Sequence, residues 1–400
     1  MDDDIDRQSG FEESLTDLIG VGPKPFSRAI DRSFKPWHRP RKHYVRVRQW
    51  QSEIEYLVRD LKSKGRWSSE LRYLTLPGSD LLDIRHLLAT VCAQGSIRMR
   101  YLGFNSAADV SGEQATVIGS QFAMNRRDLV DEESEVVPND FRLVGDVRSE
   151  PSRRVRRAGP FHVINLDLCG GFAGKQSETS GMPNYFAALQ AVLDGQRNCD
   201  HEFLLLITSR MDQDSVDEPK LASLTTIVQE VFDSCEAYAD SLVEAWALPG
   251  NREAVAESLS SVELFMLGIS QWIVRAGLDA GLRASVRGVM TYRVGGGVGD
   301  DNIVSLAIRF RPQRYLRPDS SGLIYTGRAE VPIKDKECES STGIPGRISG
   351  RTMVDDAIRA DGSYQECVTG TADLLVDAGY SREDYVSWVS GLKGETAEAE

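Results

Sequence analysis

The chain has 400 residues, of which 41% are hydrophobic and 27% charged. This composition is typical of a folded globular protein, and the length allows a substantial core. The net charge of −13 argues against indiscriminate binding to nucleic acid. No apolar run reaches the roughly 20 residues that span a bilayer, and the acidic N-terminus does not resemble a targeting peptide. We therefore expect a cytoplasmic protein without a membrane segment.

The residue types that bind metals are scattered along the sequence. The six cysteines form no CxxC pair, and the five histidines show no HExxH spacing. The sequence therefore predicts neither a disulfide framework nor a zinc site, and we expect no metal dependence.

Residues 1–64 are expected to form an N-terminal arm, with a short helix around Glu13–Ile19, followed by a basic and aromatic helical segment. Prolines at positions 36 and 40 predict extended backbone in KPWHRP, and apolar spacing predicts a helix from Lys42 to Lys64. Within residues 32–48, basic side chains alternate with aromatic ones, a pattern that can contact phosphates and stack on bases. The alternative is a solvated loop whose arginines balance nearby acids. The residues that we expect to contact a nucleic acid are Trp37, Arg39, Arg41 and Lys42.

Strands alternate with helices in the next part of the chain. An acidic stretch, DEESE, precedes the third predicted strand, and an arginine-rich loop at 148–157 precedes the fourth. This alternation predicts a parallel sheet with helices on both faces. The predicted strands are Leu71–Leu76, Ile97–Phe104, Asp140–Val147, His162–Leu166 and His201–Thr208. The predicted helices are Leu81–Ala93, Gly112–Leu129 and Pro183–Gly195.

The chain changes character after the fifth strand. Residues 220–282 read as helices, and residues 284–311 read as an antiparallel hairpin around a glycine-rich turn. The turn, GGGVG at 295–299, lacks the Lys-Ser/Thr of a phosphate-binding loop. Residues 312–350 are predicted to be irregular, and residues 353–392 to form short helices. We therefore expect an N-terminal segment over 1–64, a sheet domain over 65–312 and a C-terminal extension over 313–400.

This order of elements resembles that of the class I S-adenosylmethionine-dependent methyltransferases, whose seven-stranded sheet ends in one antiparallel strand. The resemblance implies an α/β, Rossmann-like, mostly parallel sheet with a C-terminal antiparallel hairpin and helical additions at both ends. It also implies S-adenosyl-L-methionine as the cofactor. By position, the cofactor-binding residues would be Pro77, Gly78, Ser79 and Asp80 after the first strand, Asn105 after the second and Asp146 after the third. The alternative for Asp80 is that it caps the following helix.

The stretch FHVINLDLCGGF, at Phe161–Phe172, carries the candidate catalytic residues. An apolar strand would deliver Asp167 to its carboxyl end, where open α/β sheets bind ligands. The resemblance gives Asp167 and the Leu168 carbonyl the role of holding an amino group so that its lone pair faces the methyl donor. Gly170 and Gly171 would let a substrate approach the backbone. Cys169 is either a nucleophile, as in pyrimidine C5 methylation, or a small buried residue.

The sequence therefore predicts an S-adenosylmethionine-dependent methyltransferase whose acceptor could be an amino group of a nucleic acid. One alternative is a catalytically degenerate binding or scaffold protein, with the C-terminal extension contacting a protein partner. Another is a different nucleotide-dependent α/β enzyme, which would place the strand Ile303–Phe310 parallel to its neighbours.

Overall fold

A computed structural model of the protein describes residues 33–106, 113–168, 170–175, 181–247, 258–295, 301–313 and 333–397. Three predictions fall outside these residues: the helix around Glu13–Ile19, the role of Cys169, and residues 296–299 of the glycine-rich turn.

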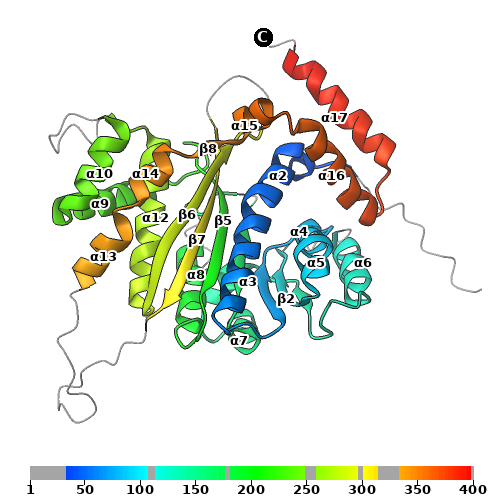
Figure 1. Ribbon diagram of the computed structural model, residues 1–400, viewed down its shortest axis with the longest axis horizontal. Helices are drawn as coiled ribbons and strands as arrows, with labels where there is room; N and C mark the ends of the chain where they lie inside the picture. The colour runs from blue at the N-terminus through cyan, green and yellow to red at the C-terminus, as the bar shows by residue number, and fades with distance from the viewer. Residues whose placement is uncertain are drawn as a thin grey trace, which may run out of the picture. The chain divides into compact units, whose positions relative to one another are not determined.

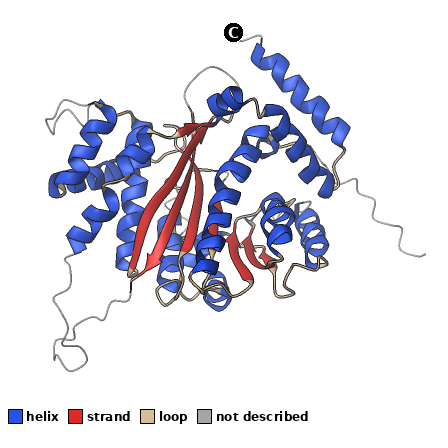
Figure 2. Ribbon diagram, viewed as in Figure 1, coloured by secondary structure: helices blue, strands red, loops and turns tan. Residues whose placement is uncertain are grey.

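The centre of the fold is one eight-stranded sheet with the order β3-β2-β1-β4-β5-β7-β6-β8 (Figures 1 and 2). Its strands are β1 Glu70–Thr75, β2 Arg98–Phe104, β3 Glu135–Val137, β4 Val163–Asp167, β5 Phe203–Arg210, β6 Leu282–Tyr292, β7 Ile303–Pro312 and β8 Thr352–Met353. Strands β1 to β5 pair in parallel, whereas β7 runs antiparallel to both β5 and β6. The Rossmann-like fold with a terminal antiparallel hairpin is therefore confirmed. The sheet has one strand more than the seven that the resemblance implied, because the short β8 pairs with β6 at the edge. The antiparallel placement of β7 also contradicts what the other nucleotide-dependent α/β enzyme would require.

Helices cover both faces of the sheet, because its central strands are apolar on both sides. The apolar core on one face of the sheet includes residues of α7 Glu150–Ala158, α8 Tyr185–Gly195, α9 Glu218–Ser234, α10 Glu236–Trp246, α12 Ser261–Asp279 and α14 Ile344–Ser349. The other face packs against α2 Pro40–Val45, η2 Arg46–Gln51, α3 Ser52–Ser63, α4 Leu82–Leu87, η3 Leu88–Cys92, α6 Glu113–Asn125 and α15 Val354–Asp361. Further short elements are η1 Pro36–His38, α5 Ala93–Gly95, η5 Phe141–Gly145 and α13 Ile333–Ser341. Among the described helices, none is both long and apolar enough to cross a lipid bilayer.

The last two helices, α16 Tyr364–Asp377 and α17 Arg382–Ala397, belong to a small apolar cluster that also contains Phe34 and Leu82. Helix α16 lies directly against α2, and a Cβ on Gly370 would lie 2.1 Å from Nε2 of His43. The C-terminal helix α16 thus supports α2, which lies within residues 1–64 (Figure 1).

Four secondary-structure predictions are wrong in part. The predicted strand Asp140–Val147 contains the 3₁₀-helix η5, and the third strand lies earlier, at Glu135–Val137. The arginine-rich loop at 148–157 is largely the helix α7, because Ser149 caps it and Pro151 suits its first turn. Within residues 312–350, the stretches of α13 and α14 are helical. In KPWHRP the residues before each proline are extended as predicted, but Pro36–His38 form a 3₁₀ turn.

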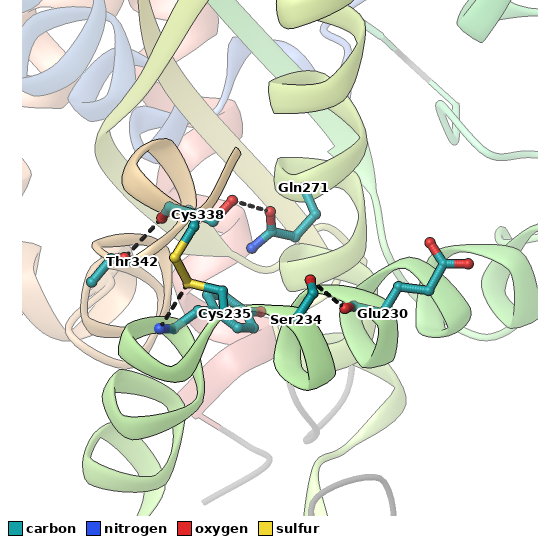
Figure 3. Close-up of a disulfide and its surroundings, with 8 residues drawn as sticks. Glu230, Ser234, Cys235, Gln271, Cys338 and Thr342 are labelled. Carbon is teal, nitrogen blue, oxygen red and sulfur yellow. Dashed lines mark hydrogen bonds between the residues drawn. A yellow bond between two sulfur atoms is a disulfide. The ribbon is translucent and has the colours of Figure 1, made fainter. Parts of the chain in front are cut away.

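The expectation that the cysteines form no disulfide is also wrong. Cys235, at the start of α10, is bonded to Cys338 in α13, across 103 residues of sequence (Figure 3). The bond fixes α13 against α10, and the neighbouring Ser341 hydroxyl donates to Gln271 of α12 at 2.6 Å. Sequence spacing alone could not show this pairing, because the two cysteines meet only through the fold.

Candidate active site

A pocket of about 470 Å³ lies at the carboxyl ends of β1 and β4. These two strands are neighbours, and the chain leaves them in opposite directions along the sheet, toward β2 and toward β5. Such a switch point is where open α/β sheets bind their ligands. The volume falls within the range of small-molecule sites.

The loop after β1 forms one wall of the pocket. Gly78 faces Trp37, since a Cβ on this glycine would lie 3.7 Å from the indole Nε1. The Asn105 amide, after β2, donates to the Pro77 carbonyl at 2.9 Å and so joins the loops after β1 and β2. Leu81 follows in a left-handed conformation with φ of 51°, which is uncommon for a residue with a side chain. The backbone at this wall is therefore bare and held in a fixed shape.

Two carboxylates at the start of α4 have partners within the protein. Asp80 accepts a hydrogen bond from the Tyr380 hydroxyl at 3.1 Å and lies 3.4 Å from Nε2 of His38. Asp83 accepts from the hydroxyls of Tyr73 at 2.9 Å and Thr75 at 2.5 Å. Burial raises the pKa of Asp83 above its usual value, even though these two hydrogen bonds oppose the shift.

The loop after β3 contributes Asn139, Asp140 and Phe141 to the pocket. Asp140 caps η5 and binds the guanidinium of Arg142, with distances of 2.6 to 3.1 Å. Asp146, the predicted residue, lies at the far end of η5, where its carboxylate accepts from the Arg148 backbone at 2.9 Å. It does not line the pocket. The error follows from the misplaced third strand, since the pocket lies at the end of the true β3.

Asp167 reaches the pocket from the end of β4 and binds a buried lysine. Oδ1 of Asp167 lies 2.5 Å from Nζ of Lys42, and this ammonium also lies 3.3 Å from the Tyr292 hydroxyl and 4.6 Å from the ring centre of Trp50. Lys42 is only 4% exposed. Burial alone would lower the pKa of Lys42, but Asp167 and Tyr292 together outweigh it and raise the pKa above its usual value.

The basic segment before the sheet faces inward over much of its length. Arg41 binds Asp355 at 2.5 Å and the Arg293 carbonyl at 2.6 Å, and both Lys42 and Arg46 are buried. Trp37 is the most exposed of the predicted nucleic-acid contacts, at 36%. The segment therefore forms a wall of the pocket rather than an exposed basic strip.

A family model described as PP_RS20740-like matches residues 31–390 of the chain. The chain belongs to the PP_RS20740-like family. No curated protein matches it. Among solved structures, a protein of Listeria monocytogenes provisionally assigned to the class I S-adenosylmethionine-dependent methyltransferases is similar, at 8% identity and a TM-score of 0.33. The match covers 78% of this chain and 69% of that one.

In this PP_RS20740-like protein, most of the predicted site residues meet in the one pocket. Gly170 also lines it, but Gly171 does not, because its Cα faces the next loop and a Cβ there would lie 2.7 Å from the Ser215 carbonyl. Arg210 pairs with Asp212 at 2.9 Å. The predicted residues that line the pocket are Trp37, Arg39, Arg41, Lys42, Pro77, Gly78, Ser79, Asp80, Asn105, Asp167, Leu168 and Gly170.

Several polar residues of the pocket were not among the predicted site residues, and four of them bear on its chemistry. Arg46 follows Lys42 by four residues on the same predicted helix, so helical spacing could have found it. Glu113 begins the helix after the second strand and lies 3.4 Å from the Ser79 hydroxyl. Asp140 was not predicted, because the sequence analysis placed it at the start of a strand instead of in the loop after β3. Tyr292 ends a strand far along the chain, and no local pattern marks it.

Proposed function

We propose that the protein is an S-adenosylmethionine-dependent methyltransferase and that the pocket at the ends of β1 and β4 holds both cofactor and acceptor. The observation that carries this proposal is the meeting of Gly78, Asn105 and Asp167 around one cavity, at the switch point of a sheet with an antiparallel β7. These are the positions at which the resemblance to class I methyltransferases implies cofactor and acceptor contacts.

The residues present fit such a cofactor in most respects. Gly78 leaves room beside the backbone, and Phe104, Phe141 and Leu168 supply an apolar wall suited to a flat base. The family's acid for the ribose hydroxyls is replaced by Asn105, whose amide already binds the Pro77 carbonyl. Glu113 also lines the pocket, and we assign it the role of that missing acid. S-adenosylmethionine would supply an electrophilic methyl group on a sulfonium.

Asp167 and the Leu168 carbonyl would orient the acceptor. Lys42 holds Oδ1 of Asp167, and within the described residues no hydrogen bond reaches Oδ2. That oxygen and the Leu168 carbonyl could accept the two N–H groups of an amine and so direct its lone pair. Lys42 acts in this scheme as a positioning residue, because it holds Oδ1 of the carboxylate and leaves Oδ2 for the acceptor.

Calorimetry with S-adenosylhomocysteine tests the cofactor site. We expect the wild-type protein to bind, and Gly78→Val to bind at least about tenfold more weakly, because the added branches occupy the pocket while the Cβ itself has room. Gly346→Val in α14 is the control, since a Cβ there meets no atom within 4 Å and lies outside the pocket. Absence of binding by the wild type at millimolar ligand would reject the proposal.

The finer form of the proposal, an amino group of a nucleic acid as acceptor, depends on the basic segment. Burial of Lys42 and the ion pair of Arg41 count against it, whereas the exposed indole of Trp37 at the pocket favours it. Trp37→Ala tests this role more directly than replacement of Arg41 or Lys42, because those replacements would also break ion pairs within the protein. If nucleic acid is the acceptor, we expect this variant to weaken a gel shift with single-stranded DNA or RNA by about tenfold. Equal affinities of variant and wild type would remove the segment from that role.

A second candidate is a binding protein that does not transfer methyl groups. The observation that favours it is the Lys42 ammonium on Asp167, because it occupies part of the position where an acceptor amine would bind. This candidate predicts tight binding of S-adenosylhomocysteine but no transfer of labelled methyl groups to any fraction of a cell extract. Labelling of an acceptor would exclude it.

A further inference from the structure

The most unusual group in the pocket is the guanidinium of Arg46. The residue lies in η2, lines the pocket and is 3% exposed. Its guanidinium donates a long hydrogen bond of 3.4 Å from Nη2 to the Trp37 carbonyl. In the described part of the chain, Nε and Nη1 have no hydrogen-bond partner. A buried charge without partners is costly, so an uncompensated guanidinium calls for an explanation.

The carboxylates around Arg46 are bound by other groups. Asp167 is held by Lys42, Asp83 by two hydroxyls, and Asp80 by Tyr380. Within the described residues none of the three lies within 4.0 Å of the guanidinium. Burial lowers the pKa of Arg46 despite the charges of Asp167 and Asp83. The protein therefore builds a cation into the pocket wall and does not neutralise it.

Other buried arginines of this protein are treated differently. Arg85 binds Asp377 and the Asp80 carbonyl, and Arg309 binds both Asp60 and Glu202. Arg46 thus departs from the way the fold usually accommodates a buried guanidinium.

We propose that Arg46 forms an oxyanion subsite in the pocket, which takes the carboxylate or phosphate group of a small molecule bound there. A guanidinium binds such groups through charge-assisted hydrogen bonds, and its planar donors match their geometry. The anion would accept hydrogen bonds from Nε and Nη1. Because the site is shielded from water, the electrostatic attraction between the anion and the guanidinium would be strong. The inference rests on the proposed function for the identity of the adenosyl ligand, but not for the existence of the subsite.

Two sources of the anion can be separated by calorimetry. The first arm compares S-adenosylhomocysteine with its decarboxylated analogue, which differs by the carboxylate alone. If the cofactor supplies the anion, the wild type prefers the carboxylate form by at least tenfold, and Arg46→Met abolishes this preference. The second arm titrates formate and inorganic phosphate into protein saturated with S-adenosylhomocysteine. If the acceptor supplies the anion, the wild type binds one of them and Arg46→Met does not.

Thermal unfolding of the ligand-free protein separates a ligand-binding role from a structural one. We expect Arg46→Met to leave the melting temperature unchanged or raise it, because it removes an unpaired buried charge. Arg309→Met is the matched control: it breaks two ion pairs of a buried arginine far from the pocket, so it lowers the melting temperature and leaves ligand preference intact. A lowered melting temperature for Arg46→Met with unchanged ligand preference would overturn the proposal.

Different results would reject the Arg46 subsite and the methyltransferase proposal. If the wild type binds neither adenosyl ligand, the methyltransferase proposal fails, and the titration of formate and phosphate into the ligand-free protein still tests Arg46. If both adenosyl ligands bind equally and neither anion binds in an Arg46-dependent way, the subsite is rejected while the cofactor site stands.

Discussion

Replacing Asp167 by leucine is expected to lower the free energy of unfolding by about 3–5 kcal/mol, because it leaves the buried Lys42 ammonium without a counter-charge. The Lys42 side chain is 5% exposed, whereas that of Asp167 is 24% exposed. The reverse change, Lys42→Met, should therefore cost less, since water can reach the remaining carboxylate. The double variant should recover much of the loss, because it carries neither charge. Urea unfolding of the three variants gives the coupling energy of the pair.

A surface pair provides the control for this cycle. Arg197 and Asp194 lie 3.5 Å apart, and each side chain is about half exposed. Their coupling is expected to be below about 0.5 kcal/mol. If Asp167→Leu costs no more than a variant of the surface pair, Lys42 is not held by this carboxylate in solution. The role of Lys42 as a positioning residue would then fail as well.

The fold could be predicted largely from apolar runs and their order. Strands β1, β2, β4 and β5 each contain a continuous buried stretch, so their positions were recovered to within about two residues. Strand β3 has three residues and begins with Glu135, which is too short and too polar to stand out. The later stretch DFRLVGDV alternates like a strand but forms η5, because Asp140 caps a helical turn.

The candidate site was partly predictable for a related reason. Parallel strands bring the residues after them to one edge, so Gly78, Asn105 and Asp167 could be grouped without a structure. The inward orientation of the basic segment could not be predicted. Lys42 meets Asp167 across 125 residues, and Arg41 meets Arg293 across 252. The sequence pattern allowed either a nucleic-acid contact or a solvated loop, whereas α15 and α16 pack against α2.

The protein is expected to lose stability steeply below pH 6.5, because burial lowers the pKa values of several of its histidines. Burial lowers the pKa of His43 to about 4 and the pKa values of His86 and His162 to about 3. Since the unfolded chain binds protons with a pKa near 6.5, it takes up more protons than the native state as the pH falls. Each of these histidines should therefore cost about 2 kcal/mol of stability between pH 7 and pH 5. Asp83 opposes this trend, because its raised pKa lets the native state take up a proton.

His162 allows the cause of this acid sensitivity to be isolated. Its Nδ1 accepts a hydrogen bond from the Arg72 backbone at 3.1 Å, which requires the neutral ring. His162→Asn keeps an acceptor near that position and removes the titrating group. We expect the free energy of unfolding, measured in urea from pH 8 to pH 5, to fall by about 2 kcal/mol less in this variant than in the wild type, with most of the difference arising below pH 7. The difference in unfolding free energy between variant and wild type at pH 8, where the histidine is neutral in both states, measures any packing defect separately from the pH effect. Carboxylates remain ionised in the unfolded chain over most of this range, so parallel slopes for variant and wild type would show that His162 is not buried in its neutral form.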